Sequence, residues 1–136
     1  MRLIRCSAGD VPRLAQMNKR LIEDEGSSNP MTVPELEMRM AGFLEEGYGA
    51  FFFEEDGTVV GYALVRYTSQ PLYLRQFYIE RDCRRRHLGE QAFRMLLGHL
   101  RTDTIDIDVL PRNRAGRAFW KSLGFEETCI SMSYRG

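Results

Sequence analysis

A cluster of basic residues is the first feature of the sequence that suggests chemistry. Four arginines fall within six consecutive positions: Arg81, Arg84, Arg85 and Arg86. They lie between a run of strand-forming residues that ends at Ile79 and a helical repeat that begins at Leu88. The first turn of a helix has unpaired N–H groups and a dipole that favours an anion, so guanidinium groups beside it suit a phosphate or pyrophosphate. A solvated charged turn accounts for the same residues without a ligand.

Two predicted elements position this basic turn. A strand precedes it, because aromatic and aliphatic residues dominate the segment from Tyr73 to Ile79. A helix follows it, because apolar residues recur there at helical spacing: Leu88, Ala92, Met95, Leu96 and Leu100. The sequence therefore predicts a strand, a basic turn and an amphipathic helix in direct succession.

The remainder of the chain also alternates between strand and helix patterns. The predicted strands cover residues 3–6, 48–55, 58–67, 104–109 and 127–134, and the other predicted helices cover 10–22, 32–46 and 113–123. Thr32 and Glu35 form a capping box, and Asp56-Gly57 is a typical two-residue hairpin connection. This order predicts an α/β fold with one mixed sheet and helices on its faces.

Bulk properties limit the possible functions. The 136 residues, 43% hydrophobic and 28% charged, indicate a single globular domain over residues 1–136. The net charge of zero argues against nucleic acid or an anionic membrane as a partner, and no apolar run is long enough for a membrane span or a signal peptide. Three scattered cysteines predict neither a disulfide framework nor a metal site. We expect a cytoplasmic protein.

Two separated segments resemble motifs of one family. Arg84-Arg85-Arg86-His87-Leu88-Gly89 resembles the R/Q-x-x-G-x-G/A loop of the GNAT superfamily of acetyl-CoA-dependent N-acetyltransferases. Asn113 to Phe125 resembles that family's downstream N-x-x-A-x-x-x-Y-x-x-x-G-F segment. The order of elements is similar as well, so the resemblance covers nearly the whole chain. It implies a mostly antiparallel central sheet flanked by helices.

The resemblance implies acetyl-CoA as the acyl donor and assigns a set of residues to it. The basic loop would bind the pyrophosphate, and the pantetheine arm would pair with the strand before it like an added strand, where that strand splays from its neighbour. Asn113 matches an asparagine that contacts the cofactor in the family. The full set implied for acetyl-CoA is Phe77, Tyr78, Ile79, Arg84, Arg85, Arg86, His87, Leu88, Gly89, Glu90, Asn113, Phe119 and Trp120.

Two residues depart from the family pattern. His87 stands where the family usually has glycine, although histidine tolerates a positive φ better than most residues. Trp120 stands where the family has a tyrosine that is thought to protonate the departing thiolate, and an indole N–H is a donor but not a practical acid. Trp120 packing on the sheet and Trp120 contacting the cofactor both remain open.

The residues that would bind and activate an amine are less well defined. Where the family often has a carboxylate on the central strand, this chain has Arg75 and Gln76. Family architecture places the end of the first helix over the acceptor cleft, so we expect acceptor contacts from Glu23, Asp24, Glu25 and Asn29, unless these residues are simply solvated. Tyr78 and Tyr134 are the candidates for the acid, and Gln76 can only orient a water.

The resemblance implies transfer of an acetyl group to a primary amine by direct attack, in a monomer or a homodimer. A catalytically weak acyl-CoA sensor is the alternative, because Trp120 replaces the tyrosine and no base is evident. Nucleic-acid binding through the arginine turn is a third hypothesis, which the neutral net charge disfavours. The sequence does not identify the acceptor.

Overall fold

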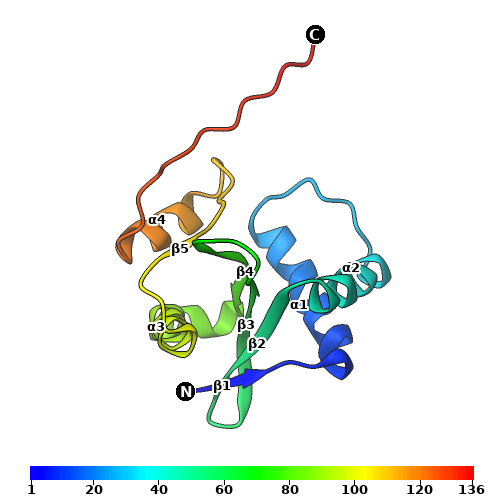
Figure 1. The fold of residues 1–136 in the computed structure, drawn as a ribbon, viewed down its shortest axis with the longest axis vertical. Coiled ribbons are helices and arrows are strands. Elements are labelled where there is room, and N and C mark those ends of the chain that lie inside the picture. The colour runs from blue at the N-terminus through cyan, green and yellow to red at the C-terminus, as the bar shows by residue number, and fades with distance from the viewer.

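A five-stranded sheet forms the centre of the computed structural model, in the order β1-β2-β3-β4-β5 (Figure 1). The structure describes residues 1–136, except for the side chains of Arg85 and Arg86. The strands are β1 (Arg2–Arg5), β2 (Tyr48–Glu55), β3 (Thr58–Arg66), β4 (Leu72–Ile79) and β5 (Ile105–Asp106). β1 to β4 pair antiparallel and β5 pairs parallel to β4, which confirms the predicted mixed, mostly antiparallel sheet.

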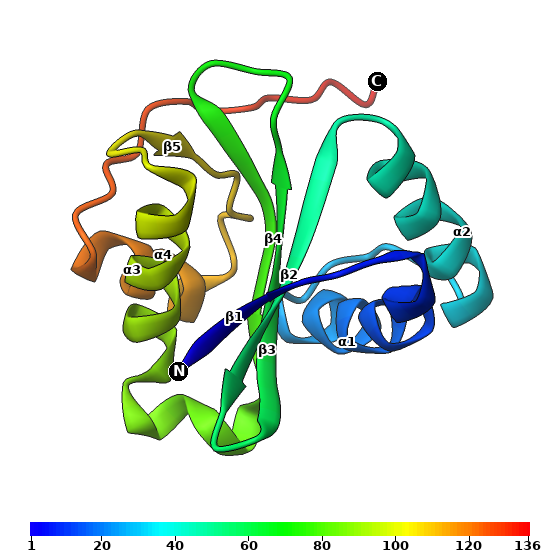
Figure 2. The same ribbon diagram turned by 60° about the horizontal axis from the view of Figure 1, so that its bottom comes forward.

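Helices cover both faces of this sheet (Figure 2). α1 (Val11–Asp24) and α2 (Val33–Glu45) lie on one face, and α3 (Leu88–Leu100) and α4 (Arg114–Ser122) lie on the other. Two short 3-10 turns, η1 (Ala8–Asp10) and η2 (Arg81–Arg86), precede α1 and α3. Within the described chain, no helix has both the length and the apolar character that a bilayer span needs.

Local sequence signals define several element boundaries as predicted. Thr32 Oγ1 accepts from the backbone N–H of Glu35, and the Glu35 carboxylate accepts from the backbone N–H of Thr32, which completes the predicted capping box at α2. Asp56 and Gly57 adopt φ values of 51° and 79°, the left-handed conformations that a tight hairpin turn requires. The β2–β3 hairpin is therefore set by its own two-residue connection.

β4 diverges from β5 soon after the two strands meet. The parallel pairing includes only Leu72 with Ile105 and Tyr73 with Asp106, so the strand predicted for residues 104–109 is much shorter in the structure. The described backbone of β4 from Leu74 to Ile79 therefore pairs with β3 but has no strand partner on its other edge. The splay implied by the family resemblance is present.

The predicted final strand over residues 127–134 is wrong. In the structure this segment is extended and exposed, and it leads away from the body of the molecule (Figure 1). Its alternating apolar residues, Ile130, Met132 and Tyr134, are between 85% and 92% exposed. The alternation is typical of a strand, but a strand also needs an edge to pair with, and β5 forms only two residues of ladder.

Candidate active site

A cavity of about 370 Å³ lies where β4 separates from β5. Its walls come from β4, the end of α1, the turn before α3, and α4. Most of the residues that the sequence assigns to the cofactor line it: Phe77, Tyr78, Ile79, Arg84, His87, Gly89, Glu90, Asn113, Phe119 and Trp120. Leu88 instead points into the core with 5% of its surface exposed, and the side chains of Arg85 and Arg86 lie outside the described part of the structure.

The turn into α3 adopts the conformation that an anion-binding helix start needs. His87 has φ 57° and ψ 21°, so the left-handed position is filled by histidine in place of the usual glycine. At Gly89 an added Cβ would lie 3.0 Å from the ring of Phe119, which means that glycine allows α3 and α4 to approach closely. The first backbone N–H groups of α3 thus begin beside the cavity.

A carboxylate from α1 already pairs with the arginines of this turn. Nε of Arg81 donates to Oδ1 of Asp24 at 2.8 Å, and the guanidinium of Arg84 pairs with Oδ2 of the same carboxylate. Partial burial by itself would raise the pKa of Asp24, but hydrogen bonds and positive charge from Arg84 and Arg81 outweigh it and lower that pKa. Arg84 is also oriented by its Nε, which donates to the backbone oxygen of Ile79 at 2.8 Å.

A second carboxylate, that of Glu25, lines the same cavity, and its pKa is shifted in the opposite direction. Burial, reinforced by the negative charge of Asp24, raises the pKa of Glu25. A carboxylate of raised pKa beside a reacting amine is suited to accept a proton near neutral pH. The other two predicted acceptor residues do not line the cavity: Glu23 is exposed, and the side-chain oxygen of Asn29 accepts from the backbone N–H of Met31 at 3.0 Å.

The three predicted catalytic candidates have different surroundings. Tyr78 lines the cavity, and burial together with the carboxylate of Glu80 raises the pKa of Tyr78 to about 12, so its phenol keeps its proton at neutral pH. Gln76 is buried, and its Oε1 accepts from the hydroxyl of Tyr62 at 2.8 Å. Tyr134 is 92% exposed on the C-terminal segment and does not line the cavity, so its expected role has no geometric basis.

Trp120 both packs on the sheet and lines the cavity. Its ring meets four others edge-on at centroid distances between 4.8 and 5.5 Å: Phe77, Phe93, Phe119 and Phe125. These contacts hold α4 against α3 and β4. The two interpretations of Trp120 that the sequence left open are therefore compatible in this position.

Asn113 begins α4 at the edge of the cavity. Its Oδ1 accepts from the backbone N–H of Gly116 at 3.0 Å, which caps the helix. An added Cβ on Gly116 would lie 2.4 Å from Nδ2 of Asn113, so the glycine makes room for the cap. The capping bond uses the side-chain oxygen of Asn113 and orients its amide nitrogen for other partners.

Sequence reasoning missed the partners of the basic turn and part of the cavity wall. Asp24 lies 57 and 60 positions from Arg81 and Arg84, and no local pattern indicates a pairing over that separation. Arg20 and Glu80, whose Nε and Oε1 are 3.1 Å apart, likewise connect α1 to the end of β4. Leu21 lines the cavity from a position that the helical repeat assigns only to the core.

Known proteins share this fold. The model of the acetyltransferase (GNAT) family matches residues 15–125. The fold is similar to that of a possible acetyltransferase from Clostridium difficile 630, at 18% identity over 99% of this chain and 96% of that one with a TM-score of 0.78. A protein from Clostridium acetobutylicum, described as a predicted acetyltransferase with acetyl-CoA, gives 17% identity, 98% and 95% coverage and a TM-score of 0.75.

The aminoglycoside N-acetyltransferase AAC(6')-Iy, in complex with a bisubstrate analogue of coenzyme A and acetylneamine, is also similar: 18% identity, 99% and 97% coverage, TM-score 0.73. No curated protein sequence matches. At these identities the solved structures support the fold, whereas the family model covers most of the chain at the level of sequence. The chain belongs to the GNAT family of acetyltransferases.

Proposed function

We propose that this protein transfers the acetyl group of acetyl-CoA to a primary amine inside the cavity beside β4. One observation carries the proposal: the unpaired edge of β4 and the start of α3 face a single cavity. An unpaired strand edge can pair with the amides of a pantetheine arm, and a helix start can bind a diphosphate. These are the two ends of one acyl carrier.

The diphosphate would lie at the turn formed by Arg84 and His87, with the first N–H groups of α3. Arg85 and Arg86 remain candidates on the strength of the sequence motif alone. Phe119 and Trp120 would cover the pantetheine from α4, because both line the cavity opposite β4. The acetyl-CoA named with the similar Clostridium acetobutylicum protein supports this choice of donor.

The chemistry would proceed by direct attack. The nitrogen lone pair forms a C–N bond with the thioester carbonyl carbon, the C–S bond breaks, and coenzyme A leaves as the thiolate with that electron pair. The proton lost by the amine passes to the carboxylate of Glu25, directly or through one water, because Glu25 combines a place in the cavity with a raised pKa. A thiol of ordinary pKa ~8.5 is a tolerable leaving group without an acid at Trp120.

A binding titration and a turnover assay test the proposal together. Trp120 is the only tryptophan and lines the cavity, so its fluorescence should change as acetyl-CoA binds. Release of free thiol on addition of amines should follow. Glu25→Gln should keep the binding signal and lower kcat by about 10²-fold, since general base catalysis contributes about that much.

The matched control is Glu23→Gln, because Glu23 is a neighbouring but exposed carboxylate that does not line the cavity. Its kcat should stay near that of the wild type. Binding of acetyl-CoA without thiol release across a broad panel of amines would instead favour an acyl-CoA sensor. The tryptophan at position 120, in place of the family's tyrosine, is also consistent with a sensor. No binding at all would refute both.

A further inference from the structure

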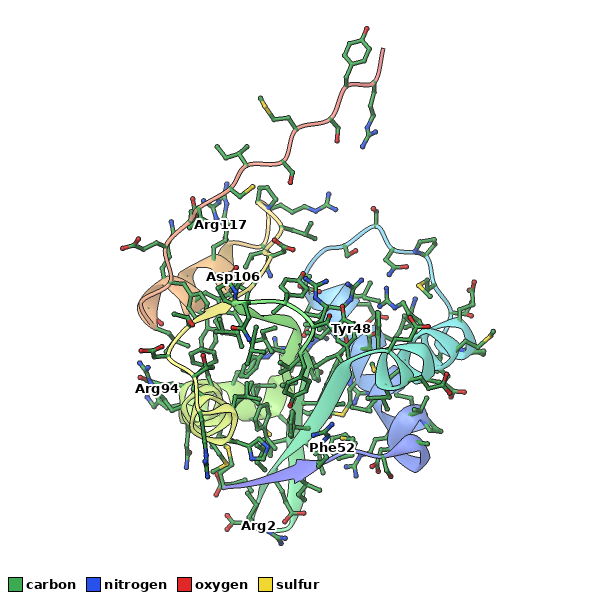
Figure 3. The ribbon with its side chains drawn as sticks, in the orientation of Figure 1. Arg2, Tyr48, Phe52, Arg94, Asp106 and Arg117 are labelled. Atoms are coloured by element: carbon green, nitrogen blue, oxygen red, sulfur yellow. The ribbon has the colours of Figure 1, made fainter. Side chains whose placement is uncertain are left out.

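Two guanidinium groups, one from α2 and one from β4, lie over the same aromatic ring, that of Phe43. The Cζ atom of Arg39, on α2, lies 5.5 Å from the ring centroid of Phe43, and that of Arg75, on β4, lies 4.7 Å from it. Tyr48, which Figure 3 labels at the beginning of β2, packs on the same ring with centroids 4.7 Å apart. Among the described side chains, neither arginine forms an ion pair with a carboxylate.

Arg39 is held in this place with its charge only partly compensated. Its Nη2 donates to Oδ1 of Asn18 at 3.1 Å, while its Nε is buried and has no hydrogen-bond partner among the described residues. Burial, and then the positive charge of Arg75, lower the pKa of Arg39. Two neighbouring guanidinium groups without a carboxylate are unfavourable, and an anion that meets their accessible N–H groups would compensate both charges.

Helix α1 connects this pair to the active-site cavity, because Arg39 bonds to Asn18 of α1 and Leu21 and Asp24 of the same helix line the cavity. Asn18, the partner of Arg39, lies two helical turns before Glu25, the residue that caps the end of α1. The hydroxyl of Tyr62 on β3 donates to Oε1 of Gln76, the neighbour of Arg75 on β4, at 2.8 Å. Burial raises the pKa of Tyr62, the charge of Glu25 raises it further and the charge of Arg39 opposes them, in keeping with this arrangement.

We propose that the acceptor is an amine that also carries an anionic group, a carboxylate or a phosphate, and that Arg39 and Arg75 bind this group. The inference rests on the proposed function, because it takes the cavity at Glu25 as the place where the amine reacts. The amine end then meets the carboxylate, and the anionic end meets the two arginines. A neutral or purely cationic amine leaves the arginine pair uncompensated.

Packing alone does not account for the pair. Arginine over an aromatic ring occurs elsewhere in this chain, for example Arg13 over Phe52 at 5.5 Å and Arg66 over Tyr73 at 4.7 Å. Of the described polar side-chain atoms that are buried, Nε of Arg39 is the one without a partner. Two guanidinium groups on one ring, neither of them in an ion pair among the described side chains, distinguish the Phe43 site from these cases.

Matched pairs of acceptors test the inference. Thiol release at saturating acetyl-CoA would be measured with alanine against alaninamide and with O-phosphoethanolamine against ethanolamine. We expect kcat/KM to favour the anionic member of at least one pair by about tenfold or more, and the preferred pair tells carboxylate from phosphate. A ratio near one in both pairs, with the neutral amines acetylated, would overturn this inference and leave the proposed function standing.

Arginine variants identify the groups responsible. Two variants, Arg39→Gln and Arg75→Gln, should each reduce the ratio of kcat/KM between the anionic and the neutral amine by at least about fivefold. Arg75 is exposed, so its substitution should not disturb folding. Comparing ratios between wild type and variant cancels the different basicities of the amines. Arg13→Gln is the control, since it removes an arginine of α1 that stacks on a different ring, Phe52, and should leave the ratio unchanged. Unchanged ratios in both test variants, or no thiol release with any of the four amines, would also overturn the inference.

Discussion

Asp24 competes for the arginine that the proposed function assigns to the diphosphate, and its removal should therefore improve donor binding. In the Asp24→Asn variant the guanidinium of Arg84 loses an ionised partner, while its Nε keeps the bond to the backbone oxygen of Ile79. The arginine stays in place with its charge available. The same substitution removes a negative charge from the space where two phosphate groups would lie.

The size of the effect follows from the exposure of the pair. The side chain of Asp24 is 13% exposed and that of Arg84 is 43% exposed, so the pair is partly screened and contributes about 1 kcal/mol. If that energy is no longer lost when acetyl-CoA binds, Kd should fall by about fivefold at 25 °C. The gain should shrink as salt is added, because screening weakens both the pair and the phosphate contacts.

Titration of the Trp120 fluorescence with acetyl-CoA measures this change, with Glu23→Gln as the control of equal charge. Stability should move in the opposite direction. The lowered pKa of Asp24 means that its carboxylate stabilises the fold above the unfolded-state pKa and loses this effect as the pH falls through the folded-state pKa. Asp24→Asn should thus unfold more easily at neutral pH while binding more tightly. Equal or weaker binding would refute the competition.

Three further predictions concern protonation, strand spacing and thiol reactivity. The raised pKa of Glu25 predicts that kcat/KM falls as the pH decreases, with an apparent pKa above the ordinary carboxylate value of ~4.3; an apparent pKa at the ordinary value would contradict this. Glu25→Gln should also be more stable than the wild type at neutral pH, because a group whose pKa is raised in the folded state costs stability as the pH increases. Gly61→Ala should lower the unfolding free energy by about 1–3 kcal/mol in a denaturant titration, because its Cβ would lie 2.1 Å from the backbone oxygen of Tyr78, whereas Gly98→Ala, with open space around it, should not destabilise. Native thiol labelling should modify Cys129 first, because Cys6 is buried and its pKa is raised to about 12 mainly by that burial; rapid loss of all three thiols would be inconsistent with this core.

Features with local causes were predictable from the sequence. The capping box of Thr32 and Glu35 and the Asp56-Gly57 turn each depend on residues within four positions of one another, and both formed as expected. The left-handed conformation of His87 agrees with the glycine that the family resemblance implies at this position, and histidine tolerates it better than most residues. The turn that faces the cavity was therefore recognisable before the fold was known.

Features that depend on distant partners were not predictable in this way. Asp24 meets the arginine turn across 60 positions, and the stacking of Arg39 and Arg75 on one ring requires Phe43 of α2 to lie beside Arg75 of β4. The C-terminal segment shows the converse error. Its alternation satisfies the local requirement for a strand, but β5 supplies too short an edge, and pairing is a property of two segments.

The two walls of the cavity differ in how firmly they are built. β4 is hydrogen-bonded along its length to β3, whereas α4 has no fully buried residue and is attached through the rings around Trp120. Backbone amides of α4 should consequently exchange with deuterium at much lower opening free energies than those of β3 and β4. A molecule that contacts both walls would slow this exchange selectively in α4. Hydrogen exchange would therefore detect a ligand in the cavity even when no reaction takes place.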